Sequence, residues 1–243
     1  MNQFQSFLIA LQFLTIIPIR LREPVDSKNI GYSLAYYPLV GVVITLILLL
    51  SVYLLADQSS WVISVLCLTL WVLLTGGLHL DGLADSADAW LGGLGDKDKT
   101  LAIMKDPASG PIAVVTMILV LLIKFVMLNE LISQQDWLSI GIAIVLARTA
   151  LPLLLITTPY VRKAGLGSLL TENMPKNLLK WLVLIIMTAS VLLSSFTLVM
   201  VFLISFLLLR FWMEQRLGGT TGDTAGAMVE LIEMTVLITA VVI

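Results

Sequence analysis

The chain has 243 residues, of which 59% are hydrophobic and only 12% are charged. Soluble domains carry about twice that charged fraction, so the composition excludes an ordinary soluble protein. Transmembrane barrels consist of short segments with alternating hydropathy, and the chain has no such pattern. We therefore expect an all-α, polytopic bundle of transmembrane helices that forms a single domain. The net charge of −2 says little about partners, and no nucleic acid is expected among them.

Apolar stretches long enough to cross a bilayer follow one another along the chain. A spanning helix needs about 20 mainly apolar residues. The stretches of this kind are 36–56, 61–80, 111–132, 138–158 and 224–243. Residues 178–212 are too long for one helix and suit two short ones that turn near Ser194 and Ser195. The sequence thus predicts about seven spans. The shorter segment 3–17 is expected to lie in the interface, to re-enter or to span.

Basic residues fall in alternate connections between these spans. If the chain crosses the membrane once at each of the seven predicted spans, an arrangement called the threading below, twelve of the fourteen Lys and Arg residues lie on the same side. They are Arg20, Arg22, Lys28, Lys97, Lys99, Lys105, Arg162, Lys163, Lys176, Lys180, Arg210 and Arg216. Lys and Arg are enriched in cytoplasmic loops, so this side is predicted to be the cytoplasm. The remaining two, Lys124 and Arg148, lie within predicted spans.

Three aspartates follow the second apolar stretch, in GGLHLDGLADSADAW at 76–90. Asp81, Asp85 and Asp88 are spaced i, i+4 and i+7, so on a helix they share an arc of roughly 60°. Carboxylates on one stripe repel each other unless a cation lies among them. Hard oxygen ligands suit Mg²⁺ or Mn²⁺ together with substrate phosphates. The alternative is a solvated helix face, although such faces usually mix charge signs.

A second polar motif, GGTTGDTAGAMVE at 218–230, precedes and enters the last span. Asp223 and Glu230 are spaced i and i+7, with the small residue Gly226 between them. Asp223 either joins the aspartates of the first motif or caps the helix, a position at which Asp is favoured. The threading places both motifs on the cytoplasmic face. His79 points away from Asp81 on a straight helix, which favours a structural role for it.

Two basic side chains lie within the predicted spans, where a charge is costly. Arg148 is interpreted as a contact for substrate phosphate. Lys124 is interpreted mainly as a structural partner of Glu130 or Glu233. Lys105 and Asp106 directly precede the third span, where Lys105 either contacts phosphate or marks the membrane edge.

Several blocks of the sequence resemble one known family. GGLHLDGLADSADAW is similar to the signature of the cobalamin synthase family, the adenosylcobinamide-GDP ribazoletransferases. Further blocks match that family in the same order along nearly the whole chain. They are FLTIIPIR, YYPLVG, IMKDPASGPIAV, ARTALPLLL, YVRKAGLGSLL and LGGTTGDTAGAMVE. Ala89 departs from the glycine found in many members.

The resemblance implies a reaction and a location. The family joins α-ribazole, or its 5′-phosphate, to adenosylcobinamide-GDP and releases GMP, in the bacterial cytoplasmic (inner) membrane and with Mg²⁺. On that basis Asp81, Asp85, Asp88 and Asp223 are expected to be catalytic and to bind one or two Mg²⁺ ions. The residues expected to contact substrate are Lys105, Asp106, Arg148, Arg162, Lys163 and Glu230. The acceptor's phosphorylation and the number of copies in a homo-oligomer stay open.

Two other classes of protein are weighed against this one. A CDP-alcohol-type phosphotransferase also places aspartates at a cytosolic helix end, but its pattern continues as Asp-Gly-x-x-Ala-Arg, whereas Asp81-Gly82-Leu83-Ala84 is followed here by Asp85 and no Arg. A secondary transporter usually places coupling carboxylates near the midplane within repeated units. Most acids here gather at helix ends, and the sequence has no internal repeat.

Overall fold

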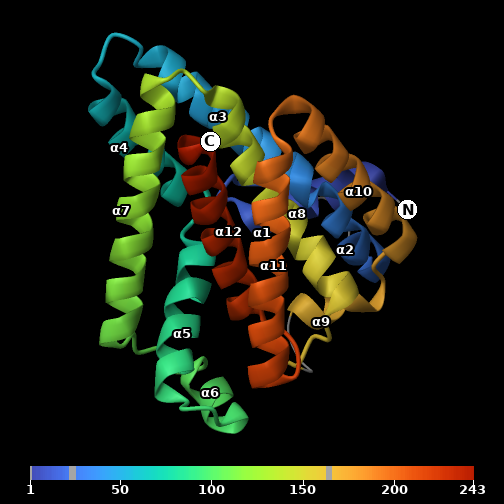
Figure 1. The fold of residues 1–243 in the computed structure, drawn as a ribbon. Coiled ribbons are helices and arrows are strands. Elements are labelled where there is room, and N and C mark those ends of the chain that lie inside the picture. The colour runs from blue at the N-terminus through green and yellow to red at the C-terminus, as the bar shows by residue number, and fades with distance from the viewer. Residues whose placement is uncertain (1, 22–25, 163–165) are drawn as a thin grey trace.

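A computed structural model describes residues 2–21, 26–162 and 166–243 of the chain (Figure 1). These residues form helices, and the only β pairing among them is an isolated bridge between Tyr160 and Thr220. In chain order the elements are α1 Gln3–Leu14, α2 Ser27–Ser33, the 3₁₀ turn η1 Leu34–Tyr36, α3 Tyr37–Leu54, α4 Ser60–Leu74, α5 Leu78–Gly92, α6 Lys97–Ile103, α7 Pro111–Ser133, α8 Trp137–Thr157, α9 Leu166–Glu172, α10 Lys176–Leu193, α11 Phe196–Leu217 and α12 Gly222–Val242.

The predicted all-α membrane bundle is confirmed. Within the described ranges, six helices are long and apolar enough to cross a bilayer, and the bent pair α4 and α5 gives up to seven. In the most apolar 18-residue stretch of α7, only 22% of the residues are buried inside the bundle, and in that of α10 only 17%. Such helices present apolar surface outward, as lipid-facing helices do. The predicted turn between α10 and α11 at Ser194 and Ser195 is also confirmed.

Two expected spans have different limits. The first span begins earlier than predicted, because α2, η1 and α3 run on as one apolar stretch from Ser27 to Leu54. The segment within 3–17 forms the 12-residue helix α1, which is shorter than the length that a straight span requires.

The second span is not the straight helix predicted over 61–80. It breaks after α4, and α5 leaves at 85° to it. Gly76 and Gly77 have φ angles of +62° and +67°, a conformation that right-handed helices exclude and that glycine adopts readily. The amide of Ile16 donates to the freed carbonyl of Leu74 at 2.8 Å. The three aspartates therefore lie inside a helix of their own and not in a loop after the span.

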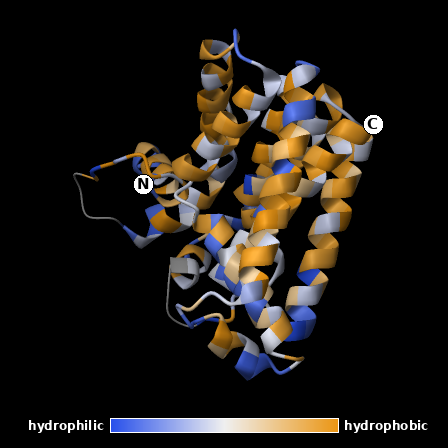
Figure 2. Ribbon diagram, turned by 90° about the vertical axis from the view of Figure 1, so that its left-hand side faces the viewer, coloured by the Kyte–Doolittle hydropathy of each residue, from blue (hydrophilic) through white to orange (hydrophobic). Residues whose placement is uncertain are grey.

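The ends of the bundle agree with the predicted threading. In Figure 1 the C-terminus and the connection between α7 and α8 lie at the upper end, whereas α6 and the connection between α11 and α12 lie at the lower end. The upper connections 57–60, 133–137 and 194–195 contain no Lys or Arg. Figure 2 shows hydrophobic residues along most of the long helices and a group of hydrophilic residues at the lower end. Both aspartate motifs thus lie toward the same side of the bundle.

Helices α5 and α12 approach each other closely because small residues face the contact. A Cβ atom added at Gly82 would lie only 2.7 Å from the carbonyl oxygen of Asp223. A Cβ atom added at Gly226 would lie 3.3 Å from the Cα of His79. Real side chains almost never come as close as the first of these distances. Gly82 therefore sets how near the aspartates of α5 come to the start of α12.

A buried network of charges joins three helices in the interior of the bundle. Lys124 on α7 donates to Glu230 on α12 at 2.8 Å and also pairs with Glu233. Arg148 on α8 pairs with the other oxygen of Glu233. The four residues are at most 5% exposed, and the Lys124 ammonium lies 4.4 Å from the ring centre of Trp71. Two cations and two anions balance each other where an isolated charge is costly.

The predicted structural pairing of Lys124 is confirmed for Glu233. It does not involve Glu130, whose carboxylate accepts a hydrogen bond from Gln134 at 2.8 Å. The network thus explains why a helix as apolar as α7 carries a lysine in its middle.

Substitution of Lys124 by Met tests the network. The loss of one member leaves a buried carboxylate without its partner, a change that costs about 3–5 kcal/mol in folded proteins. We expect Lys124→Met to lower the thermal unfolding temperature in detergent strongly, and Lys124→Met/Glu230→Met to recover part of the loss. Lys180→Met, at an exposed lysine of α10, serves as the control. Equal shifts for Lys124→Met and Lys180→Met would contradict the role of the network.

Candidate active site

The three aspartates of α5 lie on one face of that helix but differ in their surroundings. Asp81 is exposed, whereas Asp85 and Asp88 are half-buried. The carboxylate of Asp88 accepts hydrogen bonds from the backbone amides of Gly110 and of Ala113, the latter at 3.0 Å. These amides belong to the start of α7, where a helix leaves its first N–H groups unpaired. Asp88 therefore fastens α7 to α5, a role that the sequence did not predict.

Asp223 lies in the first turn of α12 and is not its cap. Thr221 is the N-cap, and its hydroxyl accepts from the amide of Thr224 at 3.2 Å. The carboxylate of Asp223 instead accepts from Arg162 at 2.6 Å. The alternative in which Asp223 only caps the helix is thus wrong, and its side chain is directed to a basic partner.

Arg162 reaches Asp223 because two connections pair with each other. The amide of Val161 donates to the carbonyl of Thr220 at 2.9 Å, and the amide of Thr220 donates to the carbonyl of Pro159 at 2.8 Å. This short ladder holds the segment after α8 beside the connection between α11 and α12. As a result, one cation stands at the acidic start of α12.

Asp81, Asp85, Asp88 and Asp223, called the acidic cluster below, come from the two motifs, and the other three lie within electrostatic range of Asp85. Asp85 lies near enough to Asp81, Asp88, Asp223 and Arg162 to interact with all four electrostatically. Among the described residues, no hydrogen bond or ion pair occupies the carboxylates of Asp81 and Asp85. The packing of α5 on α12 therefore brings the two motifs together, on the single side of the bundle that the threading predicted.

The four aspartates predicted to bind Mg²⁺ can be compared with the ligands that this ion requires. Within the described parts of the chain, no three or more His, Cys, Asp and Glu side chains come close enough together to hold a metal ion. The four predicted ligands are thus not assembled into a preformed site. Mg²⁺, however, usually binds through one or two carboxylates, waters and substrate phosphates. Asp81 and Asp85 offer two unpaired carboxylates on one face, so the residues fit such an ion.

A cavity of about 220 Å³ opens beside the acidic cluster. Asp81, Asp223, His79 and Tyr160 contribute its polar lining. Burial raises the pKa of the Tyr160 phenol, and the nearby Arg162 guanidinium partly offsets this rise. The phenol therefore stays protonated near neutral pH. The arrangement provides carboxylates, one guanidinium and a neutral hydroxyl around a space that a small molecule can enter.

Comparison with known proteins gives one consistent answer. Residues 6–241 match the family described as cobalamin-5-phosphate synthase. This chain belongs to that family. A protein of Pseudomonas putida and one of Pseudomonas entomophila are each 50% identical to it, over 96% of this chain and 96% of theirs. Both are named adenosylcobinamide-GDP ribazoletransferase. No solved structure gives a significant match.

The resemblance drawn from the motifs is thereby confirmed, and the remaining predicted residues of this cobalamin-5-phosphate synthase family member can be placed. Lys105 and Asp106 are exposed in the connection between α6 and α7, which ends at the Gly110 amide bound to Asp88. The carboxylate of Asp106 accepts from the amide of Ala108 at 3.0 Å. This connection thus runs beside the aspartate face of α5.

Arg148 and Glu230 were predicted to contact substrate, but their side chains form the buried ion pairs of the bundle interior. Lys163 falls outside the described residues. Two residues of the cavity's polar lining were not expected at the site. Tyr160 had no signal beyond its place next to Val161-Arg162, and His79 was interpreted as structural. The Nδ1 atom of His79 is buried and has no hydrogen-bond partner among the described residues.

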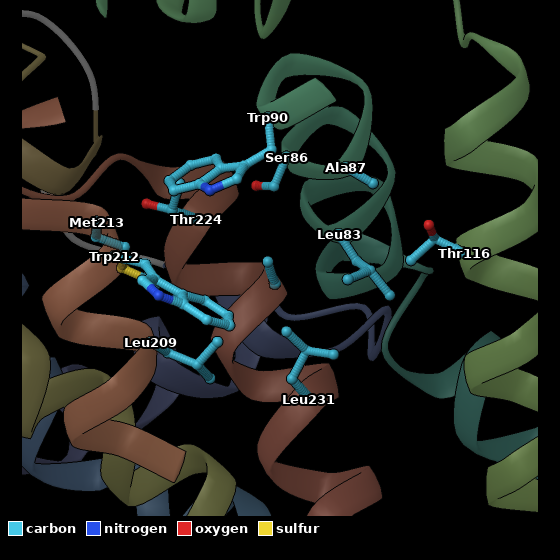
Figure 3. Close-up of a pocket in the computed structure, with 11 residues that line it drawn as sticks. Leu83, Ser86, Ala87, Trp90, Thr116, Leu209, Trp212, Met213, Thr224 and Leu231 are labelled. Carbon is cyan, nitrogen blue, oxygen red and sulfur yellow. The ribbon is translucent and has the colours of Figure 1, made fainter. Parts of the chain in front are cut away.

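A second cavity, of about 200 Å³, lies on another side of α5 (Figure 3). Its walls are Leu83, Ser86, Ala87, Trp90, Thr116, Leu209, Trp212, Met213, Thr224, Ala227 and Leu231. Figure 3 shows these side chains reaching inward from α5, α7, α11 and α12. None of these lining residues is charged, so this mainly apolar space offers no acid or base for phosphate chemistry.

Replacement of Gly82 by Ala tests whether close packing of the two helices positions the site. The new methyl group would press on the Asp223 backbone, and overpacking of this kind costs about 1–3 kcal/mol. We expect Gly82→Ala to lower both the unfolding temperature and the enzymatic rate. Gly92→Ala, on the same helix, meets only the terminal methyl of Ile103 and is the matched control. A Gly82→Ala protein as active and stable as the control would contradict the proposed packing role.

Proposed function

We propose that this chain transfers the adenosylcobinamide phosphoryl group from adenosylcobinamide-GDP to α-ribazole, or to α-ribazole 5′-phosphate, with release of GMP. The observation that carries the proposal is the meeting of the α5 and α12 carboxylates in one cluster beside a cavity. Membership of the cobalamin-5-phosphate synthase family makes this chain a transferase of cobalamin biosynthesis. The names of its 50% identical relatives support the two substrates.

The reaction exchanges one phosphorus–oxygen bond for another. A ribose hydroxyl oxygen of the acceptor forms a bond to the cobinamide-linked phosphorus. The bond from that phosphorus to the bridging oxygen breaks, and the bridging oxygen leaves as part of GMP. The hydroxyl proton passes to a base or to water. Such a transfer depends on in-line positioning and on stabilisation of charge more than on covalent catalysis.

Asp81 and Asp85 are proposed to hold Mg²⁺, because their carboxylates have no hydrogen-bond or ion-pair partner in the described part of the chain. An ion held there would neutralise negative charge on the pyrophosphate. Asp88 remains a candidate ligand, although its oxygens already accept two amide hydrogens. We assign it mainly to the positioning of α7 against the aspartate helix.

Arg162 and Asp223 form the other side of the proposed site. Their ion pair is only partly buried, with 24% and 20% of the two side chains exposed, so an incoming phosphate can compete for the guanidinium. Arg suits paired contacts to phosphate oxygens. Release of Arg162 would leave the Asp223 carboxylate free to accept the hydroxyl proton. Lys105, and Lys163 next to Arg162, are proposed as further phosphate contacts.

The protein is a multi-pass membrane protein, and its substrates are water-soluble or amphiphilic. We propose that it resides in the bacterial cytoplasmic membrane with the acidic cluster toward the cytoplasm. The support is the placement of Lys and Arg at the same end of the bundle as both motifs. Nucleotide-linked substrates made in the cytoplasm would then reach the site without crossing the bilayer.

Substitution of Asp85 by Asn tests the acidic cluster. The change keeps the size of the side chain and removes the charge that binds the cation, so GMP release in liposomes should fall by roughly 10³-fold, a loss of about 4 kcal/mol of transition-state stabilisation. Asp98→Asn, at an exposed aspartate of α6, should release GMP at the wild-type rate. Near-normal turnover by Asp85→Asn would contradict the metal role of this residue.

Removal of divalent cations tests the cofactor. We expect excess EDTA to stop GMP release from adenosylcobinamide-GDP and α-ribazole, and added Mg²⁺ to restore it. The thermal unfolding temperature should change little, because the described ion pairs hold the bundle without a metal. Full turnover after complete chelation would show that Mg²⁺ is not required.

A further inference from the structure

The cavity at the acidic cluster has two chemically different parts. Its polar part comprises Asp81, Asp223, His79 and Tyr160. The remainder is formed mainly by apolar side chains from four other elements, namely Phe13, Tyr37, Leu151, Leu155 and Leu170, together with Leu78 of α5. A site for pyrophosphate alone has no need of such walls. The lining therefore indicates a ligand with a polar end and an apolar, ring-like end.

The size and polarity of the cavity discriminate between the groups of the two substrates. A space of about 220 Å³ is far too small for a corrin ring with its side chains. Guanine is small enough, but it carries several donors and acceptors along its edge, and each would need a partner when buried. Five of the six apolar residues named above are leucine or phenylalanine, and their side chains offer no hydrogen-bonding atom to a guanine edge. A dimethylbenzimidazole ring is flat, mostly apolar and has a single free acceptor nitrogen.

We propose that this cavity is the acceptor pocket, in which the benzimidazole ring of α-ribazole lies among Phe13, Leu151, Leu155 and Leu170 and its ribose points to Asp81 and Asp223. The proposal rests on the proposed function and assigns one of its two substrates to a defined place. The cobinamide-GDP donor then approaches the acidic cluster from outside the cavity.

One further detail of the lining supports an aromatic base. The rings of Phe13 and Tyr37 lie nearly parallel, 24° apart with centres separated by 6.1 Å, and present an aromatic wall on which a flat ring can pack.

Filling the cavity tests the proposal. Leu155→Trp places a larger side chain in the apolar part, remote in sequence from every aspartate. We expect the KM for α-ribazole to rise about tenfold or more, as for a pocket that rejects a group it cannot hold, while the KM for adenosylcobinamide-GDP stays unchanged. Leu231→Trp fills the second cavity and is the matched control, for which neither KM should change.

Binding of free 5,6-dimethylbenzimidazole to the purified protein provides a readout that needs no turnover. Equilibrium dialysis should detect binding to the wild type and to Leu231→Trp, and weaker binding to Leu155→Trp. In wild-type kinetics the same compound should compete with α-ribazole and not with adenosylcobinamide-GDP.

The outcomes separate this proposal from the function on which it rests. If the wild type releases GMP but Leu155→Trp raises the KM for adenosylcobinamide-GDP alone, guanine occupies the cavity and the proposal is overturned. Competition of dimethylbenzimidazole with the donor would overturn it as well, even if Leu155→Trp fails to fold. Absence of GMP release by the folded wild type would instead refute the proposed function.

Discussion

The close packing of α5 on α12 is the contact on which the rest of the site depends. Gly82 lies against the backbone of Asp223, and this approach brings together carboxylates from motifs far apart in the sequence. Repulsion between these charges opposes the contact. Three features offset it, namely the Arg162 guanidinium at Asp223, the α7 amides at Asp88 and the cation proposed at Asp81 and Asp85.

The acidic residues of the protein divide into two groups with different tasks. Glu230 and Glu233 lie inside the bundle, where Lys124 and Arg148 neutralise them and tie α7, α8 and α12 together. Asp81, Asp85 and Asp223 lie at the end of the bundle. Two of these carboxylates have no partner among the described residues, and the third has a partner, Arg162, that we propose substrate phosphate displaces. A charge network in the interior thus holds the helices whose ends form the site.

Much of this arrangement follows from the sequence alone. Hydropathy predicted the helical membrane bundle, Lys and Arg placement predicted that both motifs share one side, and the i, i+4, i+7 spacing predicted the aspartate face. The break at Gly76 and Gly77 could not be predicted from hydropathy, because the same composition suits one straight span. The engagement of Glu230 by Lys124 and the capping of α7 by Asp88 depend on which helices are neighbours. Spacing within one helix carries no information on that point.

The central claim is that Asp85 of α5 and Asp223 of α12 act in one site. A double-mutant cycle with Asp85→Glu and Asp223→Glu measures this directly, because each change keeps the charge and shifts the carboxylate by one methylene. Rates of GMP release should be determined for both single variants and the double variant. Residues that share a ligand show coupling of about 0.5–3 kcal/mol, so the double variant should depart clearly from the product of the two single losses. A double variant whose loss equals that product would contradict a shared site.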